Sequence, residues 1–194
     1  MRQSTRTDED KAMIEQTTLN CRCGQVALQV TGNPILTADC TCKSCRDAAR
    51  IIGSLSGGED VLDAHGGTRL VLYRKDRLDC IAGADRLSEF RLRPDSATRR
   101  VVATCCSSAM LLEFEKAHWI DVYGQRWLPG PMPEPELRTM TSDLPDGTRL
   151  PDDIPNHKRQ SVGFFAKLIG AWIGMRFRTP QLTFVKGTLN VPQT

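Results

Sequence analysis

The chain has 194 residues, enough for one domain with an appendage or for two small domains, and it can bury a core of ordinary size. Its 26 Lys and Arg and 23 Asp and Glu leave a net charge of +3, which is too balanced to indicate a nucleic-acid-binding protein. The longest apolar stretch, residues 164–175, contains a lysine and is shorter than the ~20 residues that a transmembrane helix needs. We therefore expect neither a nucleic-acid partner nor a transmembrane segment.

The start of the chain is polar. Residues 1–15 are expected to be a flexible lead-in, and they contain no run of about 7–15 apolar residues of the kind that forms the core of a signal peptide. We therefore expect an unprocessed, cytoplasmic protein. Because the cytoplasm is reducing, the eight cysteines are expected to be metal ligands or catalytic groups rather than disulfide partners.

Residues 16–125 are expected to form a mainly β domain with antiparallel strands. Apolar residues recur at every second position in several short segments, which is typical of strands with one face in a core. These residues are Val26, Leu28, Val30, Leu70, Leu72, Phe90 and Leu92. Turn-forming groups such as "GNP" and "RPDS" separate the segments. Residues 42–52, "CKSCRDAARII", predict a short helical turn between them.

Three cysteines, Cys40, Cys42 and Cys45, lie within six residues of one another. Thiolates held this close repel each other, so a cation should compensate them, and sulfur ligands favour zinc. Three protein ligands leave a tetrahedral zinc one position that water or a substrate sulfur can take, as in a catalytic site. In the alternative interpretation, a distant side chain such as His65 or Cys80 completes the shell and the site is only structural.

If Cys21 and Cys23 belong to a regular strand, they are expected to project to the same side of it, so that both sulfurs could bind one ion. The other concentrated thiols are Cys105 and Cys106, and a structural ion shared by all four would join the start of the β domain to a late strand. Neighbouring residues in a strand point to opposite faces, so Cys105 and Cys106 can both bind only if the chain turns there. The alternative is one ligand and one buried spare. Cys80 is expected to be a small core residue.

Residues 126–155 are expected to form a proline-rich arm. Seven of the eleven prolines lie between Leu128 and Pro155, and proline removes backbone donors and fixes φ. An extended, irregular segment is the natural consequence.

Residues 156–194 predict a basic amphipathic helix followed by a tail. One helical stripe holds Phe165, Leu168, Ile169, Trp172 and Ile173. After Asp153 there is no further carboxylate side chain, but there are six cations: Lys158, Arg159, Lys167, Arg176, Arg178 and Lys186. Packing of the stripe on the β domain is the favoured interpretation. The alternative is that residues 156–178 contact a membrane surface or a partner protein.

The cysteine motifs resemble those of the glutathione-dependent formaldehyde-activating enzymes, a family that also includes centromere protein V. The resemblance rests on "CRCGQV" at 21–26, "CTCKSCR" at 40–46 and "YRKDRLDCIAGADRLSEFRL" at 73–92, and it covers roughly residues 17–115. It implies a fold of stacked antiparallel sheets, sometimes called a β-tent. It also implies one structural zinc and a second zinc, held by three cysteines, where a glutathione adduct is handled.

The resemblance assigns roles to individual positions. Cys21 and Cys23 are similar to half of the structural site, and Cys40, Cys42 and Cys45 to the catalytic triplet. The family's late motif has two cysteines, separated by two residues, and then a glycine. Here Ala103 and Ser107 stand at the positions of the first cysteine and the glycine, and Cys106 at the second cysteine. Cys105 could replace the missing ligand.

The resemblance thus predicts a zinc-dependent carbon–sulfur lyase that acts on a small-molecule adduct of a thiol and an aldehyde. Two zinc ions per chain are expected, with glutathione as a candidate co-substrate. The alternative is a non-catalytic, zinc-stabilised module that binds a partner or a membrane through its basic helix. A weaker third hypothesis is a redox switch through Cys105 and Cys106.

Overall fold

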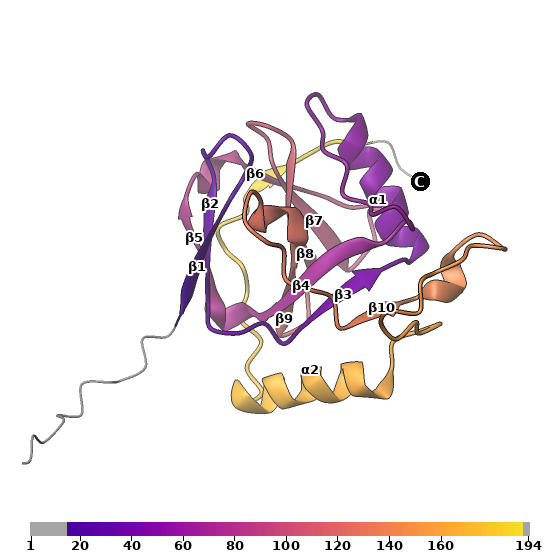
Figure 1. The fold of residues 1–194 in the computed structure, drawn as a ribbon. Helices are drawn as coiled ribbons and strands as arrows, with labels where there is room; N and C mark the ends of the chain where they lie inside the picture. Colours follow the sequence, from indigo (N-terminus) through magenta and orange to yellow (C-terminus); the bar gives the residue numbers. More distant parts are fainter. Residues whose placement is uncertain (1–14, 192–194) are drawn as a thin grey trace, which may run out of the picture.

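Two β-sheets form the body of the protein in the computed structural model, which describes residues 15–191 (Figure 1). The smaller sheet is antiparallel and has the order β1-β2-β5. Its strands are β1 (Gln16–Asn20), β2 (Ala27–Thr31) and β5 (Leu78–Ala82). The expected flexible lead-in lies, apart from its last residue, outside the described residues, as do residues 192–194 of the expected tail.

The larger sheet has eight strands in the order β10-β3-β4-β9-β8-β7-β6-β11. They are β3 (Leu36–Cys40), β4 (Thr68–Arg74), β6 (Leu87–Phe90), β7 (Thr98–Ala103), β8 (Ser108–Phe114), β9 (Trp119–Tyr123), β10 (Leu137–Thr139) and β11 (Gly187–Thr188). Only the two edge strands pair in parallel, β10 with β3 and β11 with β6, among the residues that the structure describes. The predicted mainly β fold of antiparallel sheets is confirmed.

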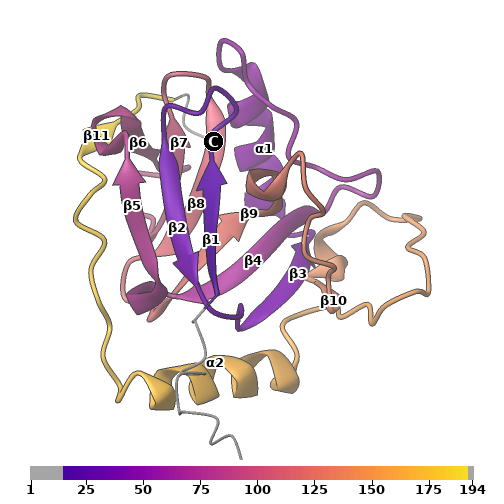
Figure 2. The ribbon, with the colours of Figure 1, turned by 60° about the vertical axis from the view of Figure 1, so that its left-hand side comes forward.

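Both faces of the central strands are buried, and alternate residues serve the two faces. On β4, Val71 and Tyr73 pack in a core that the small sheet covers, whereas Leu70 and Leu72 pack in a second core on the other face. Figure 2 shows the small sheet in front of the strands of the large one. Because a strand's side chains alternate in direction, one apolar run can supply both cores.

The helix α1 (Lys43–Ser54) covers the second core. It begins where the Cys42 sulfur accepts a hydrogen bond from the backbone N–H of Cys45, at 3.3 Å, and so acts as the N-cap. Ala48 and Ile52 face the sheet and are fully buried. The expected helical turn is therefore a helix of 12 residues. The described part of the chain also contains four short 3₁₀ helices: η1 (Lys75–Arg77), η2 (Ala84–Arg86), η3 (Gly124–Trp127) and η4 (Thr141–Asp143).

The predicted C-terminal helix is present as α2 (Val162–Gly174), but the interpretation of its stripe is wrong for three residues. Leu168 is buried and Trp172 is half-buried, whereas Phe165, Ile169 and Ile173 are 50%, 54% and 56% exposed. The helix packs through Leu168, which does belong to the stripe, and Met175, the C-cap residue just after the helix, is also buried. Within residues 15–191, neither helix has the length and apolar character needed to cross a bilayer.

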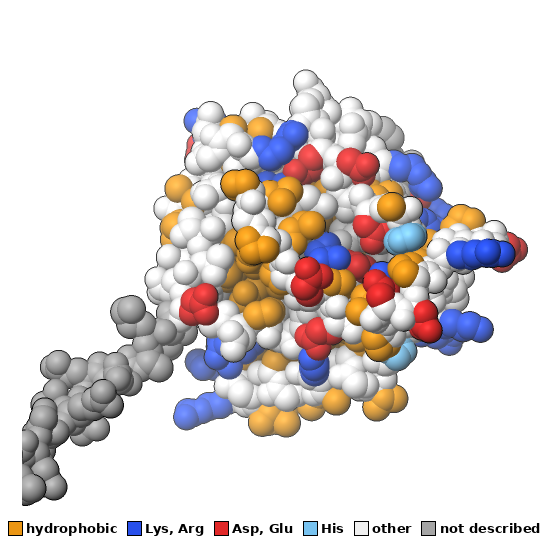
Figure 3. Space-filling model, viewed as in Figure 1, with side chains coloured by type: hydrophobic (Ala, Val, Ile, Leu, Met, Phe, Trp, Pro, Cys, Tyr) orange, Lys and Arg blue, Asp and Glu red, His pale blue; other side chains and the backbone are white. Residues whose placement is uncertain are grey.

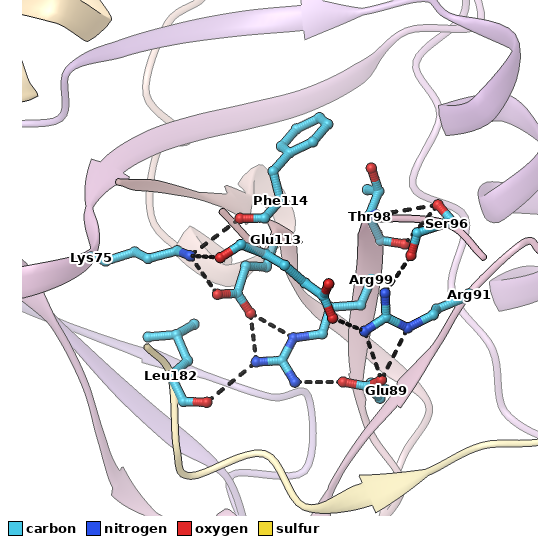
Figure 4. A network of polar contacts seen from close by, with 10 residues as sticks. Lys75, Glu89, Arg91, Ser96, Thr98, Arg99, Glu113, Phe114 and Leu182 are labelled. Atoms are coloured by element: carbon cyan, nitrogen blue, oxygen red, sulfur yellow. Dashed lines mark hydrogen bonds and ion pairs between the residues drawn. The ribbon is translucent and has the colours of Figure 1, made fainter. Parts of the chain in front are cut away.

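A network of buried charges ties η1 to three strands of the large sheet (Figure 4). Lys75 is fully enclosed, and its Nζ lies 2.6 Å from Oε1 of Glu113. The other carboxylate oxygen of Glu113 pairs with Arg99, which also pairs with Glu89. Arg99 donates to the carbonyl oxygen of Leu182 at 3.3 Å, so the network also holds the segment after α2.

Candidate metal centres and the adjoining chamber

Four cysteine sulfurs from distant parts of the chain lie together beyond the ends of β1 and β7. The sulfur of Cys21 is 3.6 Å from that of Cys23 and 3.8 Å from that of Cys105, and Cys23 and Cys105 are 3.4 Å apart. The Cys106 sulfur completes the group, in which all sulfurs lie within 4.8 Å of one another. Zinc–sulfur bonds of about 2.3 Å place four tetrahedral sulfurs about 3.8 Å apart. The donor set and its spacing therefore fit zinc.

A tight turn brings both Cys105 and Cys106 to this group. The turn follows β7 and precedes β8, and Ser107 adopts the left-handed conformation with φ 52°. That conformation favours glycine, the residue that the resemblance places at this position. The backbone N–H of Cys106 donates to the carbonyl oxygen of Ala103 at 3.3 Å. Because the chain turns here, both sulfurs lie in the cluster, which is the arrangement that ligation by both residues requires.

Polar contacts around this cluster hold its two halves together. The backbone N–H of Arg22 donates to the Ser108 hydroxyl at 3.0 Å, and its guanidinium donates to the Cys106 carbonyl at 2.6 Å. Nearby, the buried carboxylate of Glu59 accepts from Arg126 at 2.5 and 2.7 Å. These protein contacts alone hold the Cys21–Cys23 turn against the β7–β8 turn.

The second group of sulfurs belongs to Cys40, Cys42 and Cys45, whose sulfurs lie within 4.8 Å of one another. Cys40 ends β3, Cys42 caps α1 and Cys45 lies in the first turn of α1. Among residues 15–191, no fourth His, Cys, Asp or Glu donor atom lies within that distance of all three. Neither His65 nor Cys80 completes the group. The triplet therefore offers a metal three ligands and not four.

The electrostatics of the triplet favour one thiolate and oppose further ones. Hydrogen bonds from Cys40 and Cys45 lower the pKa of Cys42 to about 3. For the converse reason, the hydrogen bond with Cys42 raises the pKa of Cys40 to about 12, and contacts with both partners raise the pKa of Cys45. Two or three thiolates at this spot therefore need a cation, which is the behaviour expected of a soft-metal site.

In the four-sulfur cluster, too, the pKa of one cysteine is lowered and the pKa values of others are raised. Burial would raise the pKa of Cys106, but hydrogen bonds from the Ser108 hydroxyl and from neighbouring cysteines lower that pKa to about 6. Burial raises the pKa of both Cys21 and Cys105. Here too a bound cation would allow all four sulfurs to be thiolates together.

A chamber of about 840 Å³ opens beside the triplet, and all three of its cysteines line it. The floor is the second-core face of the large sheet, and the N-terminal part of α2 contributes to the wall. Its lining is largely apolar and includes Leu70, Leu72, Leu112, Phe114, Trp119 and Phe164. Cys80 lies elsewhere, where its sulfur donates to the Ala82 carbonyl at 3.4 Å.

Two buried charged residues face this chamber, and the sequence analysis did not single out either one. Arg100 is 1% exposed and donates to the Ser44 hydroxyl at 2.5 Å, next to Cys45, while its Nε has no partner among the described residues. Asp121 is 4% exposed, and burial raises its pKa to about 8. The available signal was a charged residue at an inward position of an apolar strand, in "TRRVVA" and in "WIDVY".

The chain was compared with family sequence models, with curated proteins and with solved structures. The sequence model of the glutathione-dependent formaldehyde-activating enzymes matches residues 16–122, more than half of the chain and the whole of both cysteine groups. No curated protein matched. Among solved structures, the crystal structure of a Rhodobacter sphaeroides protein aligns with 16% identity and a TM-score of 0.43, covering 60% of this chain and 92% of that one. By the match to its sequence model, the chain belongs to the family of glutathione-dependent formaldehyde-activating enzymes.

Proposed function

We propose that the protein is a zinc-dependent carbon–sulfur lyase that forms or cleaves the adduct of a thiol and an aldehyde. The observation that carries this proposal is the three-sulfur group of Cys40, Cys42 and Cys45, which lines a large chamber and lacks a fourth donor among the described residues. A zinc ion in that group would bind the substrate thiol at its fourth position and lower the pKa of that thiol.

The chain's own residues fix the triplet in place. The backbone N–H of Thr41 donates to the Thr139 carbonyl at 3.0 Å, which anchors the segment between Cys40 and Cys42. Arg100 holds the Ser44 hydroxyl and carbonyl, and Arg46 donates to the Asp143 carbonyl at 2.5 Å. The backbone N–H of Cys45, in the first turn of α1, donates to the Cys42 sulfur at 3.3 Å, which favours negative sulfur at the N-terminal end of this helix.

The group of Cys21, Cys23, Cys105 and Cys106 is proposed to hold a structural zinc. Its four sulfurs complete a tetrahedral shell and leave no position for a substrate. Structural zinc sites contribute about 10–16 kcal/mol of apparent binding free energy, as much as or more than the usual net stability of a domain, about 5–15 kcal/mol. Loss of this ion should therefore unfold the β domain.

The proposal is tested by replacing one ligand of the triplet. The wild-type protein should contain close to two zinc ions per chain and should turn over thiol–aldehyde adducts, glutathione–formaldehyde among them. Cys42→Ser should lose one zinc and the activity but keep its circular dichroism spectrum. Cys80→Ser is the matched control, because Cys80 belongs to neither group, and it should behave like the wild type. Absence of turnover with every thiol tried would contradict the proposal.

A second candidate function is contact with an anionic membrane surface. An exposed apolar row runs along α2 through Val162, Phe165, Ile169 and Ile173. Figure 3 shows hydrophobic side chains along the outer edge of α2 at the bottom of the view, with basic side chains near its ends. Four exposed cations flank the row, two before the helix and two after it: Lys158, Arg159, Arg176 and Arg178. Residues 158–178 contain no carboxylate of their own, although Glu136 pairs with Lys167 on α2. Apolar residues between cations complement anionic lipid.

The membrane candidate predicts binding to vesicles that contain phosphatidylserine and weaker binding to phosphatidylcholine alone. The double variant Ile169→Asp with Ile173→Asp should abolish sedimentation with the vesicles, because it places carboxylates in the apolar row. Ile81→Asp, which changes an equally exposed isoleucine on β5, should sediment as the wild type does. Equal sedimentation of wild type and double variant would eliminate this candidate.

A further inference from the structure

The chamber beside the triplet is larger than formaldehyde requires. Its volume of about 840 Å³ lies in the range of about 300–1,000 Å³ that is usual for sites that bury a drug-sized molecule. Leu70, Leu72 and Leu112 form the floor, and Phe114 and Trp119 line the same chamber. Such a lining stabilises a bound apolar group by removing its surface from water, and formaldehyde has too little apolar surface to gain from this burial.

The register of the sheet places Asp121 in the middle of this floor. Asp121 on β9 lies opposite Leu72 on β4 and opposite Leu112 on β8, and Arg100 on β7 is the next residue in the same row. Within the described residues, the carboxyl group of Asp121 has no hydrogen bond and no ion pair. A buried polar group without a partner is costly unless a ligand supplies the partner.

The other charged groups that line the chamber already have polar contacts. Lys43 pairs with Asp47, and Arg100 donates to Ser44. Asp143 accepts from the backbone N–H of Lys43 at 3.1 Å, and Arg93 lies 3.6 Å from Asp95. The neighbouring Glu113 faces away from the chamber and pairs with Lys75. Arg100 keeps one donor, Nε, without a partner, but of the charged residues that line the chamber Asp121 is the one whose side chain has no polar contact at all within the described part of the chain, so its hydrogen-bonding capacity is left for a bound molecule.

We infer that the chamber binds the carbon side of the adduct, an apolar aldehyde larger than formaldehyde, and that Asp121 exchanges a proton with the aldehyde oxygen. This assignment rests on the proposed function for its reaction. It adds a substrate class and a catalytic residue in the chamber, neither of which follows from the cysteines.

The proton transfer balances in both directions. In adduct formation, the thiolate sulfur attacks the carbonyl carbon, the π-electron pair moves to oxygen, and that oxygen takes the proton of the Asp121 carboxyl group. In cleavage, the Asp121 carboxylate takes the hydroxyl proton, the carbonyl double bond forms again, and the carbon–sulfur electron pair returns to sulfur. Burial keeps the pKa of Asp121 at about 8, so the carboxyl group is mostly protonated at neutral pH and can act as the donor.

The test uses hexanamide, an unreactive analogue of an apolar aldehyde, with formamide as its one-carbon counterpart. Calorimetry on the zinc-loaded full chain should show hexanamide binding at least about tenfold more tightly than formamide, since each buried CH₂ adds about 0.8 kcal/mol. Asp121→Ala, which removes the hydrogen-bonding group, should weaken hexanamide binding, and Asp79→Ala, at an exposed position on β5, should not. Equal affinity for the two amides would overturn the inference.

A second measurement does not depend on any variant. The infrared carbonyl band of a buried carboxylic acid should titrate near pH 8 in the wild-type protein, and hexanamide should shift that band; an unmoved band would overturn the role of Asp121. Turnover of a formaldehyde adduct without hexanamide binding would overturn this inference and leave the proposed function intact. Hexanamide binding that depends on Asp121, without turnover of any adduct, would contradict the proposed function and leave the binding part of this inference intact.

Discussion

Asp121 is enclosed in the folded protein and reaches water when the chain unfolds. Burial raises the pKa of its carboxyl group to about 8, whereas an aspartate in an unfolded chain titrates near pH 3.9. Between these values the folded state holds a proton that the unfolded state has released. This side chain therefore lowers the free energy of unfolding progressively as the pH rises from about 4 to 8.

The prediction is a stability difference that grows with pH. Asp121→Asn removes the titrating group, so its free energy of unfolding relative to the wild type should increase from pH 6 to pH 8, by at most about 1.4 kcal/mol per pH unit. Urea unfolding of both zinc-loaded proteins at several pH values measures it. Comparing the two proteins at each pH cancels the shared pH dependence of zinc binding. A difference that does not change with pH would show that Asp121 is ionised in the folded state.

At the scale of single residues, the sequence predicts some members of the candidate sites and not others. The two cysteine groups were identified from spacing and from the family resemblance, and the structure brings those sulfurs together. Cys105 and Cys106 both lie in the four-sulfur cluster because Ser107 adopts a left-handed backbone conformation. Serine rarely adopts that conformation, so the sequence does not predict it. Arg100 and Asp121 were missed because a buried charge in a strand has no local signature, and its surroundings come from other strands.

The central strands depend on the buried charge network, which yields a prediction at the scale of elements. Glu113→Gln should lower the free energy of unfolding by about 3–5 kcal/mol, because Lys75 is left enclosed without a full counter-charge. Glu115→Gln is the neighbouring control: Glu115 pairs with Arg91 at the surface, and its replacement should cost less than about 1 kcal/mol. Equal losses in the two variants, measured by urea unfolding, would contradict this account of β8.

The helix α2 shows a different limit of sequence reasoning. Its existence follows from the sequence pattern, and Ser161 caps it by accepting from the Phe164 N–H at 3.1 Å. Its buried face could not be deduced, because apolar side chains occur around much of the helix. Contact with the rest of the chain selects Leu168 and Met175, and leaves Ile169 and Ile173 in solvent. Which stripe packs is decided by the surface beneath it, and a helical pattern alone does not describe that surface.

For the whole molecule, the mainly β architecture was predictable because strand alternation and turn residues are local signals. The pairing of β10 with β3 and of β11 with β6 was not predictable, since both edge strands are short and their partners lie far away in the chain. The chamber was equally hidden: β3, β4, β7, β8, β9, α1 and α2 all contribute to its wall. Its volume and polarity emerge only when these elements are assembled.

The account as a whole depends on a metal at Cys40, Cys42 and Cys45 that keeps one coordination position for substrate. The most direct measurement is the visible absorption spectrum of protein in which cobalt(II) replaces this ion, recorded before and after a thiol is added. We predict that the thiol shifts the cobalt bands toward those of a four-sulfur site, and that Cys42→Ser removes both the bands and the shift. A cobalt spectrum that no thiol changes would show a closed site and contradict the account.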